Sequence, residues 1–374
     1  MIPFNRPFIT GKELDYIAQA HARGHLAGDG EFTRLCHQWL VEATSTRKAL
    51  LTHSCTAALE MSALLADIAP GDEVIMPSYT FVSTANAFCL RGGVPVFVDV
   101  RPDTLNIDET LIEGAITPRT RAVCVVHYAG VGCEMDSILA LAERHGLMVI
   151  EDAAQGIQAT YNGRPLGSFG ELAALSFHET KNIIAGEGGA LLINDDRHSD
   201  RAEIIREKGT NRSRFFRGQV DKYTWCDIGS SFLPGEIAAA FLWAQMGEAE
   251  AITQRRIAIW NRYHAAFSDL ERAGRLRRPV VPQNCVHNAH MYYVLLRDLA
   301  ERTRFIDHLK RRDVHAVFHY VPLHDSPAGL QLARVHGSMQ HTVELSERIV
   351  RLPLWLGLEP QQDYVIDAVR RFFG

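Results

Sequence analysis

Two residues of this sequence have side chains that suit a cofactor carrying an aldehyde and a basic ring. Lys181 comes three residues after the apolar run LAALSFH, and its amine can form a Schiff base with a carbonyl group when it is partly desolvated. Asp152 ends the apolar run in IEDAAQG, and open α/β sheets bind ligands at the carboxyl ends of their strands. Each residue alone also has an ordinary interpretation. A lysine beside a turn is most often a solvated charge, and a strand-end aspartate equally well caps the next turn.

A third feature is the start of a predicted helix in SCTAALE, residues 54–60. Ser54 can cap this helix, and the first backbone N–H groups then point outward at the positive end of the helix dipole. Such a helix start binds anions such as phosphate. The candidate phosphate ligands are the N-terminal residues Cys55, Thr56 and Ala57, together with Ser176, five residues before Lys181. Any capped helix has this pattern, so its meaning depends on the other two features.

The glycines after Lys181 also have two interpretations. Gly186 and Gly188 precede a second apolar run, GALLIN, and Gly189 begins it. They predict a tight turn into a strand, with close backbone approach to a ligand as the functional alternative.

Taken together, the three features describe one ligand, which carries a phosphate, a protonated ring nitrogen and an aldehyde. Pyridoxal 5′-phosphate (PLP) has all three groups, and it requires a lysine for its Schiff base and an acidic or basic partner at the pyridine nitrogen. The combination is far more specific than its parts, and it predicts a PLP site.

The elements that would position this site are predicted from residue 46 onward. Short β-branched runs of four to eight residues, such as EVIMP, PVFVDV and LMVIED, alternate with amphipathic stretches. Non-alternating runs suit strands buried on both faces, and repeated βα units imply a mostly parallel sheet in three layers. The runs LAALSFH and GGALLIN lie only about ten residues apart, which breaks the rhythm of a (β/α)8 barrel and favours an open sheet.

A second unit is predicted after about residue 240. The stretch FLWAQMGEAEAITQRRIAIWNRYHAAFSDLERAG indicates one long helical region, followed by a strand in HMYYVLLRD, a helix in ERTRFIDHLKRRD, a strand in AVFHYVPLH and two further helices. We therefore predict a large domain over residues 1–245 and a smaller α+β domain over residues 246–374. Residues 209–231 form a long irregular stretch, which is usually functional or disordered, and its aromatic residues and arginines argue against disorder.

Composition excludes several classes of partner. The net charge of −5 provides no basic field for nucleic acid, and no run approaches the roughly 18 apolar residues of a membrane span. The seven cysteines are odd in number, scattered and without CxxC spacing, so neither a metal site nor a disulfide framework is predicted. We expect a small-molecule substrate and a reducing cytoplasm.

Several longer phrases resemble one known family. SYTFVSTANA (78–87), VHYAG (126–130), EDAAQ (151–155), SFHETKN (176–182), GEGG (186–189) and HYVPLH (319–324) are similar to segments of the sugar-nucleotide aminotransferases, which are fold-type I PLP enzymes. The likeness runs from GDGEFT near residue 28 to RLPLWLGL near residue 351, essentially the whole chain. It implies a three-layer αβα PLP-dependent transferase fold, similar to aspartate aminotransferase, with a smaller C-terminal α+β domain.

The resemblance also implies a role for each matching residue. Lys181 would form the Schiff base, Asp152 would pair with the pyridine nitrogen, Gln155 would approach the ring hydroxyl and Phe81 would stack on the ring. The phosphate ligands would be Thr56, Ser176 and the backbone amides of Cys55 and Ala57. Family members are dimers whose active sites lie between subunits, so we expect a homodimer with shared active sites, with a dimer of dimers as a further possibility for this chain. They use glutamate as amino donor and nucleotide-linked keto sugars as acceptors, here a dTDP-linked 4-keto-6-deoxyhexose.

The sequence also departs from the family. The segment G-x-N-Y-R-M reads GSSFLP here, so Ser231 replaces an asparagine expected at the partner's phosphate, and Leu233 replaces an arginine. The nearest substitutes for that arginine, and for binding the sugar nucleotide, are Arg212, Arg217 and Lys222, although each is equally well a solvated loop charge. His319 and Tyr320 are candidates to face the substrate cleft.

Two other functions remain as alternatives. PLP-dependent sugar dehydratases of this fold have histidine in place of the Schiff-base lysine, so Lys181 weighs strongly against them. A homologue that binds PLP or a nucleotide sugar without catalysis is supported only by the departures at Ser231 and Leu233. Another nucleotide-sugar aminotransferase, acting on a UDP-linked or 3-keto sugar, also fits the family.

Overall fold

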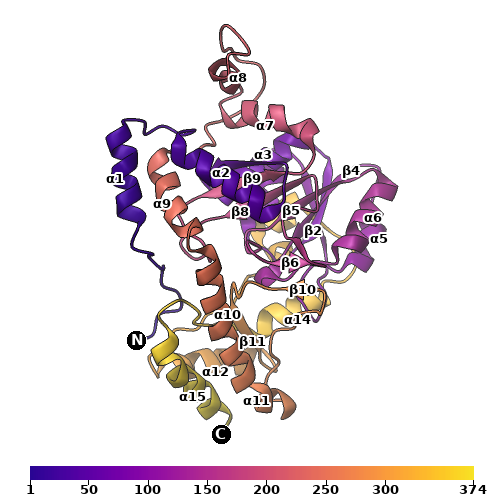
Figure 1. Ribbon diagram of the computed structural model, residues 1–374. Coiled ribbons are helices and arrows are strands. Elements are labelled where there is room, and N and C mark those ends of the chain that lie inside the picture. The colour runs from indigo at the N-terminus through magenta and orange to yellow at the C-terminus, as the bar shows by residue number, and fades with distance from the viewer.

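The computed structural model describes all 374 residues, and its centre is an open eight-stranded sheet (Figure 1). The strand order is β1-β9-β8-β5-β4-β2-β3-β12. Only β9 runs antiparallel to its neighbours, β1 and β8. The strands in chain order are β1 (Lys48–Thr52), β2 (Glu73–Pro77), β3 (Val94–Val98), β4 (Thr120–Val126), β5 (Met148–Asp152), β8 (Leu172–Ser176), β9 (Gly189–Ile193) and β12 (Arg334–Val335). The open, mostly parallel sheet is as expected from the sequence.

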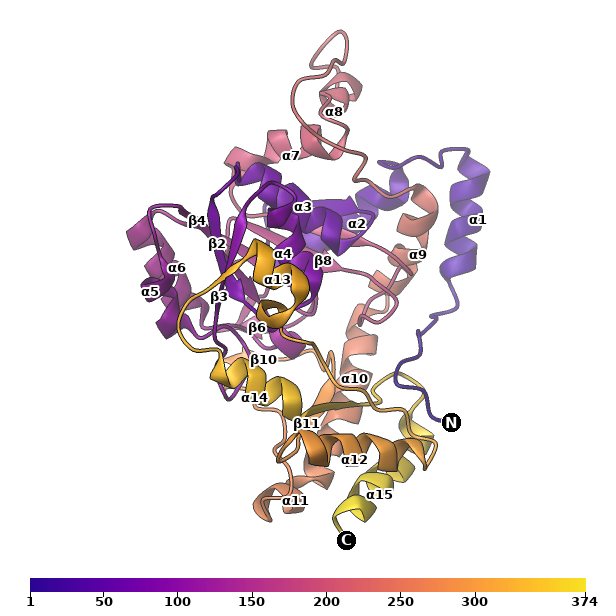
Figure 2. The same ribbon diagram turned by 180° about the vertical axis from the view of Figure 1, so that it is seen from behind.

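Helices cover both faces of this sheet, which gives three layers (Figures 1 and 2). Along β4, Val123 and Val125 pack with α5 and α6 on one face, whereas Ala122 and Cys124 pack with α3 and α4 on the other. Both faces are apolar because the strands are buried on both sides. The helices of this part are α1 (Glu13–Arg23), α2 (Glu31–Thr44), α3 (Cys55–Leu65), α4 (Val82–Cys89), α5 (Ile112–Ala115), α6 (Met135–His145), α7 (Ser199–Arg206), α8 (Arg212–Phe216) and α9 (Glu236–Met246). The predicted three-layer αβα fold is confirmed.

The C-terminal part has a smaller antiparallel sheet of β11 (Tyr292–Leu295) and β13 (Ile349–Leu352). Its helices are α10 (Ala249–Ala266), α11 (Ser268–Arg272), α12 (Leu299–Lys310), α13 (Pro327–Leu332), α14 (Gln340–Arg348) and α15 (Gln362–Phe373). A three-stranded sheet of β10 (Cys285–Val286), β6 (Thr160–Tyr161) and β7 (Arg164–Pro165) joins the two parts. None of the helices is both long enough and apolar enough to cross a lipid bilayer.

Two elements of the structure differ from those expected from the sequence. The single long helical region after residue 240 is divided at Gly247 and Phe267 into α9, α10 and α11. The strand expected in AVFHYVPLH is absent, because Tyr320 has a positive φ of 29° and Pro322 cannot donate to a strand ladder. What remains of that strand is one bridge between Val317 and Arg351.

The chain crosses the predicted division at residue 245 more than once. Ile2 pairs with Val314 of the C-terminal part, whereas β12 adds to β3 at the edge of the large sheet. Glu73 of β2 holds β12 at this edge, because its carboxylate accepts hydrogen bonds from Arg334 of β12 and from Arg119. A division into residues 1–245 and 246–374 remains our proposal for the two domains, with these two segments exchanged across it.

Candidate active site

Lys181 lies in the hairpin that connects β8 and β9. The backbone N–H of Phe177 donates to Gly188 O (2.8 Å), and that of Glu179 donates to Gly186 O (2.8 Å), where Gly186 has a φ of 79°. The Lys181 N–H donates to His178 O at 2.9 Å, so its backbone is held on the inside of the turn. Burial lowers the pKa of the Lys181 amine, which favours the neutral form that acts as a nucleophile.

Asp152 ends β5, the strand beside β8, as the sequence predicts. Its Oδ1 accepts from the Ala154 N–H at 3.1 Å, and its Oδ2 accepts from the Thr84 hydroxyl at 2.6 Å. These two bonds fix a buried carboxylate in one orientation. The negative charge of Asp152 acts on Lys181 against the effect of burial, so the two side chains lie within electrostatic range of each other.

The helix start at Cys55 lies directly against this hairpin. Ser54 caps α3 by accepting from the Ala57 N–H at 3.1 Å, which leaves the amides of Cys55 and Thr56 without an intrahelical acceptor. The Thr56 hydroxyl contacts Ser83 Oγ at 2.7 Å. A Cβ on Gly189 would lie 2.4 Å from Cys55 N, so only glycine permits this approach.

Gln155, Tyr320 and Tyr128 lie on another side of the candidate site. Gln155 Oε1 accepts from the Ala129 N–H at 2.7 Å, which turns its Nε2 toward the Tyr320 hydroxyl at 3.4 Å. The Phe81 ring is 57% exposed and its centroid lies 6.5 Å from that of Tyr320. His319 Nδ1 contacts the Tyr128 hydroxyl at 2.8 Å, and burial lowers the pKa of His319 well below its ordinary value. Tyr320 and His319 therefore reach the neighbourhood of Gln155 and Phe81.

Four predicted residues lie elsewhere in the chain. Residues 209–231 form an arm that projects beyond α7, away from the C-terminal part (Figures 1 and 2). Arg217 pairs with Glu203 at 2.8 Å, and Arg212 lies 3.9 Å from Glu207. Both arginines line a cavity of about 670 Å³ between the arm, α2 and β1, and Lys181 is not part of its lining. Lys222 and Ser231 are exposed on the arm. Leu233, which stands in place of the family arginine, lies against Gly28.

The structure adds residues that the sequence reasoning missed. Thr84, the partner of Asp152, lies three residues after Phe81 on α4, so the helical spacing in SYTFVSTANA is a signal that could have identified it. Arg351 of β13 carries a positive charge that lowers the pKa of Lys181, although 170 positions separate the two residues in the sequence. No sequence signal connects them.

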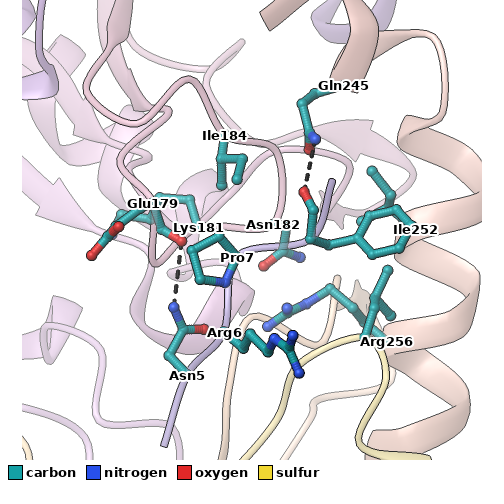
Figure 3. A pocket seen from close by; sticks show the side chains of 12 residues that line it. Asn5, Arg6, Pro7, Glu179, Lys181, Asn182, Ile184, Gln245, Ile252 and Arg256 are labelled. Atoms are coloured by element: carbon teal, nitrogen blue, oxygen red, sulfur yellow. Dashed lines mark hydrogen bonds between the residues drawn. The ribbon is translucent and has the colours of Figure 1, made fainter. Parts of the chain in front are cut away.

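A small pocket lies beside Lys181 under the N-terminal segment (Figure 3). Asn5 Nδ2 donates to Glu179 O at 3.4 Å, and Phe8 O accepts from Gln245 Nε2 at 2.9 Å. Arg256 of α10 enters this pocket with its guanidinium bonded only to the backbone oxygens of Ala289 and His290. Arg6, Arg256 and Lys181 bring three cationic side chains to the lining of this pocket, which also includes Glu179.

These residues fit PLP. Free amides at Cys55 and Thr56, with the Thr56 hydroxyl, suit a phosphate, and the glycine-dependent contact at Gly189 keeps Lys181 close to them. The oriented carboxylate of Asp152 suits a protonated ring nitrogen. Of the expected phosphate amides, that of Ala57 is already engaged by Ser54.

Comparisons with known proteins agree with this arrangement. Residues 7–370 match the model of the DegT/DnrJ/EryC1/StrS aminotransferase family. The chain is 32% identical to the spore coat polysaccharide biosynthesis protein SpsC of Bacillus subtilis, over 99% of this chain and 96% of that protein.

Solved structures of aminotransferases are also similar to this chain. The aminotransferase TlmJ of Streptoalloteichus hindustanus is 29% identical, with a TM-score of 0.91 over 100% of this chain and 99% of TlmJ. The sugar aminotransferase Spr1654 of Streptococcus pneumoniae in its PMP form is 25% identical, with a TM-score of 0.92 over 100% of this chain and 99% of that one, and a PLP form is also similar. Since the family model covers nearly the whole sequence, the chain belongs to the DegT/DnrJ/EryC1/StrS aminotransferase family and its cofactor is PLP.

Proposed function

We propose that this sugar aminotransferase transfers the amino group of glutamate to C4 of dTDP-4-dehydro-6-deoxy-D-glucose, giving dTDP-4-amino-4,6-dideoxy-D-galactose. The observation that carries amino transfer is the Lys181 amine, held in a hairpin beside the oriented carboxylate of Asp152 with its pKa lowered by burial. The phrases HETKN and REKGTNRSRFFRGQVDKYTW support the choice of sugar. They resemble the bacterial transaminase that makes this product for enterobacterial common antigen, a surface polysaccharide.

The cofactor, Asp152 and Lys181 would each have a separate role in amino transfer. PLP, when bound, supplies a ring that accepts the electron pair of a carbanion. Asp152 keeps a proton on the ring nitrogen, so that the ring can accept charge. The Lys181 amine removes the proton from the α-carbon of the donor as a general base, and later returns a proton to the sugar carbon. The first role requires the neutral amine, and the second uses the ammonium form that the amine becomes after it has taken up the proton.

The sugar nucleotide requires donors for its pyrophosphate, and this part of the proposal involves a second copy of the chain. The arm exposes Phe216 and Trp225, and its cations Arg212 and Arg217 line a cavity whose lining does not include Lys181 of the same chain. A homodimer in which the arm enters the neighbouring site would bring those cations, and Ser231, to the cofactor and the nucleotide. Further pairing into a dimer of dimers fits the same scheme. The cysteines are all free, which suits our expectation of a reducing cytoplasm.

One experiment tests donor, acceptor and product together. The purified protein is incubated with PLP, glutamate and either dTDP- or UDP-linked 4-keto-6-deoxyglucose, and the amino sugar is assigned by NMR. We expect an axial C4 amine from the dTDP sugar. A product aminated at C3, a gluco configuration or a preference for the UDP sugar would replace the proposed substrate by another nucleotide sugar. A protein that takes up no PLP and shows no cofactor absorbance would contradict amino transfer itself.

A further inference from the structure

Arg351 has an unusual environment for a guanidinium group. It lies on β13, only partly accessible to solvent, and its side chain makes neither a hydrogen bond nor an ion pair. Its Nε is fully buried without a partner. The one defined contact is with the Phe4 ring of the N-terminal segment, whose centroid lies 4.6 Å from the Arg351 Cζ. By contrast, the more deeply buried Arg206 donates to Asp29 and to Leu51 O.

A buried guanidinium without a partner is unfavourable for the stability of the folded protein. A charge withdrawn from water is normally paired and hydrogen-bonded, since its lost hydration is otherwise not replaced. Burial lowers the pKa of Arg351 and no carboxylate opposes this effect. An arginine left in this condition close to a reaction centre fits a site whose counter-ion arrives with a ligand.

Backbone contacts place Arg351 beside the segment that carries His319, and a shared cavity places it near Thr180. Its N–H donates to Val317 O at 2.7 Å, two residues before His319, and it pairs with Tyr293 in the small sheet. Thr180, the neighbour of Lys181, lines the same small cavity as Arg351.

The surroundings of Arg351 and Lys181 are rich in positive charge. The charges of Lys181 and Arg351 both lower the pKa of His290 and of His319, and Arg351 also lowers that of Lys181. Arg256 lines the same cavity, bonded only to backbone oxygens. The arrangement suits an anion that binds next to the amine of Lys181.

The two substrates of the proposed reaction carry their anionic groups at different places. An amino acid has its α-carboxylate bonded to the same carbon that carries the reacting amine. In the sugar nucleotide, C4 lies across the ring from C1, so the pyrophosphate is a whole sugar ring away from the reacting atom. A cation within electrostatic range of Lys181 therefore matches the carboxylate rather than the pyrophosphate.

We propose that Arg351 binds the carboxylate of the amino donor. This inference rests on the proposed amino transfer and adds the residue that selects amino acids as donors. The planar fork of a guanidinium suits a carboxylate with two parallel hydrogen bonds. The unpaired Nε of Arg351 and its outer nitrogens would then obtain the acceptors that the chain itself does not supply.

The test separates the two halves of the reaction in the PLP-loaded protein. Arg351→Gln removes the charge, Arg351→Lys retains it without the fork, and Arg277→Gln is the matched control. Arg277 is a half-buried arginine of the same region whose Nε and Nη2 also lack partners, yet it lines neither of the small cavities beside Lys181 and Thr180. Circular dichroism checks that each variant folds, and the Lys variant keeps the test available if the Gln variant does not fold.

Two quantities are measured for each protein. Calorimetry gives the dissociation constant of 2-oxoglutarate, which has the donor's carboxylates without its amine. Rapid mixing of the amino-loaded form with the keto sugar gives the rate of the second half-reaction. We expect Arg351→Gln to weaken 2-oxoglutarate binding roughly 10- to 150-fold, the range for a hydrogen bond to a charged group, with a smaller loss in Arg351→Lys. The second half-reaction should change by less than about threefold, and Arg277→Gln should resemble the wild type.

Three outcomes would overturn the inference. If Arg351→Gln binds 2-oxoglutarate like the wild type, Arg351 is not the carboxylate site, although amino transfer stands. If the variant instead loses the second half-reaction with the sugar nucleotide, the arginine serves the pyrophosphate. If the wild type reacts with no amino acid at all, the proposed function fails, and the carboxylate site fails with it.

Discussion

Burial and nearby charges together set the pKa of the Lys181 amine. Burial lowers the pKa of the amine, the carboxylate of Asp152 raises it, and the cation of Arg351 lowers it again, with burial as the largest effect. The balance favours an amine that can accept a proton, which a general base requires. A solvated lysine on a turn would remain charged at neutral pH.

Replacing Lys181 by alanine should therefore stop proton transfer while leaving the phosphate and ring contacts intact. We expect turnover with glutamate to fall by at least about 10³-fold, in line with the usual contribution of a positioned acid–base group. Cofactor absorbance after gel filtration should show that PLP or its amino form still binds. Retention of more than about a tenth of wild-type turnover would exclude Lys181 as the base.

Thr84 provides a second prediction at this scale. Its hydroxyl donates to Asp152 Oδ2, and its oxygen also contacts the Thr80 hydroxyl at 2.8 Å. Thr84→Val leaves one oxygen of a buried carboxylate without its partner, at a cost of about 1–3 kcal/mol. We expect turnover to fall about tenfold or more and Tm to fall by a few degrees. Thr80→Val, which does not touch Asp152, is the control, and equal effects of the two changes would show that Thr84 acts only by packing.

Elements separated in the sequence are held together by a few buried polar groups. Glu73 of β2 accepts hydrogen bonds from Arg334 of β12, Arg119 and Thr117, and its carboxylate is fully buried. The bonds from Arg334 contribute most to lowering the pKa of Glu73 to about 2. The edge strand β12, only two residues long, is thereby fastened to the sheet.

This carboxylate predicts a defined pH dependence. A carboxylate whose pKa falls on folding stabilises the native state above its unfolded pKa, near 4.5, and loses that contribution as the pH falls toward 2. Glu73→Gln should lower the free energy of unfolding at pH 7 by up to about 3 kcal/mol. Urea titrations from pH 7 to pH 3 should show this difference shrinking as the pH falls. A difference independent of pH would mean that the ion pair contributes nothing.

Local sequence patterns predict part of the site, whereas the docking of the C-terminal part does not follow from them. The positions of Lys181, Asp152 and Thr56 follow from strand ends, a helix cap and parallel pairing, all of which are local patterns. The contact of Glu73 with Arg334 and the approach of Arg351 to Lys181 depend on how the C-terminal part docks. No periodicity in either segment encodes that docking. The strand expected in AVFHYVPLH was wrong for a related reason, since tertiary contacts hold Tyr320 at a positive φ.

For the whole molecule, the arm is the feature that a single chain leaves unexplained. The large exposed apolar residues of residues 209–231 are Phe215, Phe216, Tyr223, Trp225 and Ile228. Trp225 is 79% exposed, which is unusual for so large a side chain outside an interface. We therefore expect the arm to be covered by a second copy in solution.

Mixing two inactive proteins tests whether the arm acts in the neighbouring site. Lys181→Ala is combined with a triple variant of Arg212, Arg217 and Lys222 to alanine, after unfolding and refolding together. Each mixed dimer would contain one complete site, so activity should return to about a quarter of wild type. Mixing Lys181→Ala with Asp152→Asn is the control and should restore nothing. Absence of recovery in the first mixture would place the arm's cations outside the neighbouring site.

The two segments that cross between the parts of the molecule also affect its synthesis. β3 ends at residue 98, yet its outer neighbour β12 begins at residue 334, and Ile2 pairs only with Val314. A ribosome that has released the first 245 residues has therefore produced neither a closed sheet edge nor a place for the N-terminus. The edge of β3 remains open to other chains during that interval, which is when strand edges are prone to aggregate. Premature termination anywhere before residue 335 should yield insoluble fragments rather than a free large domain.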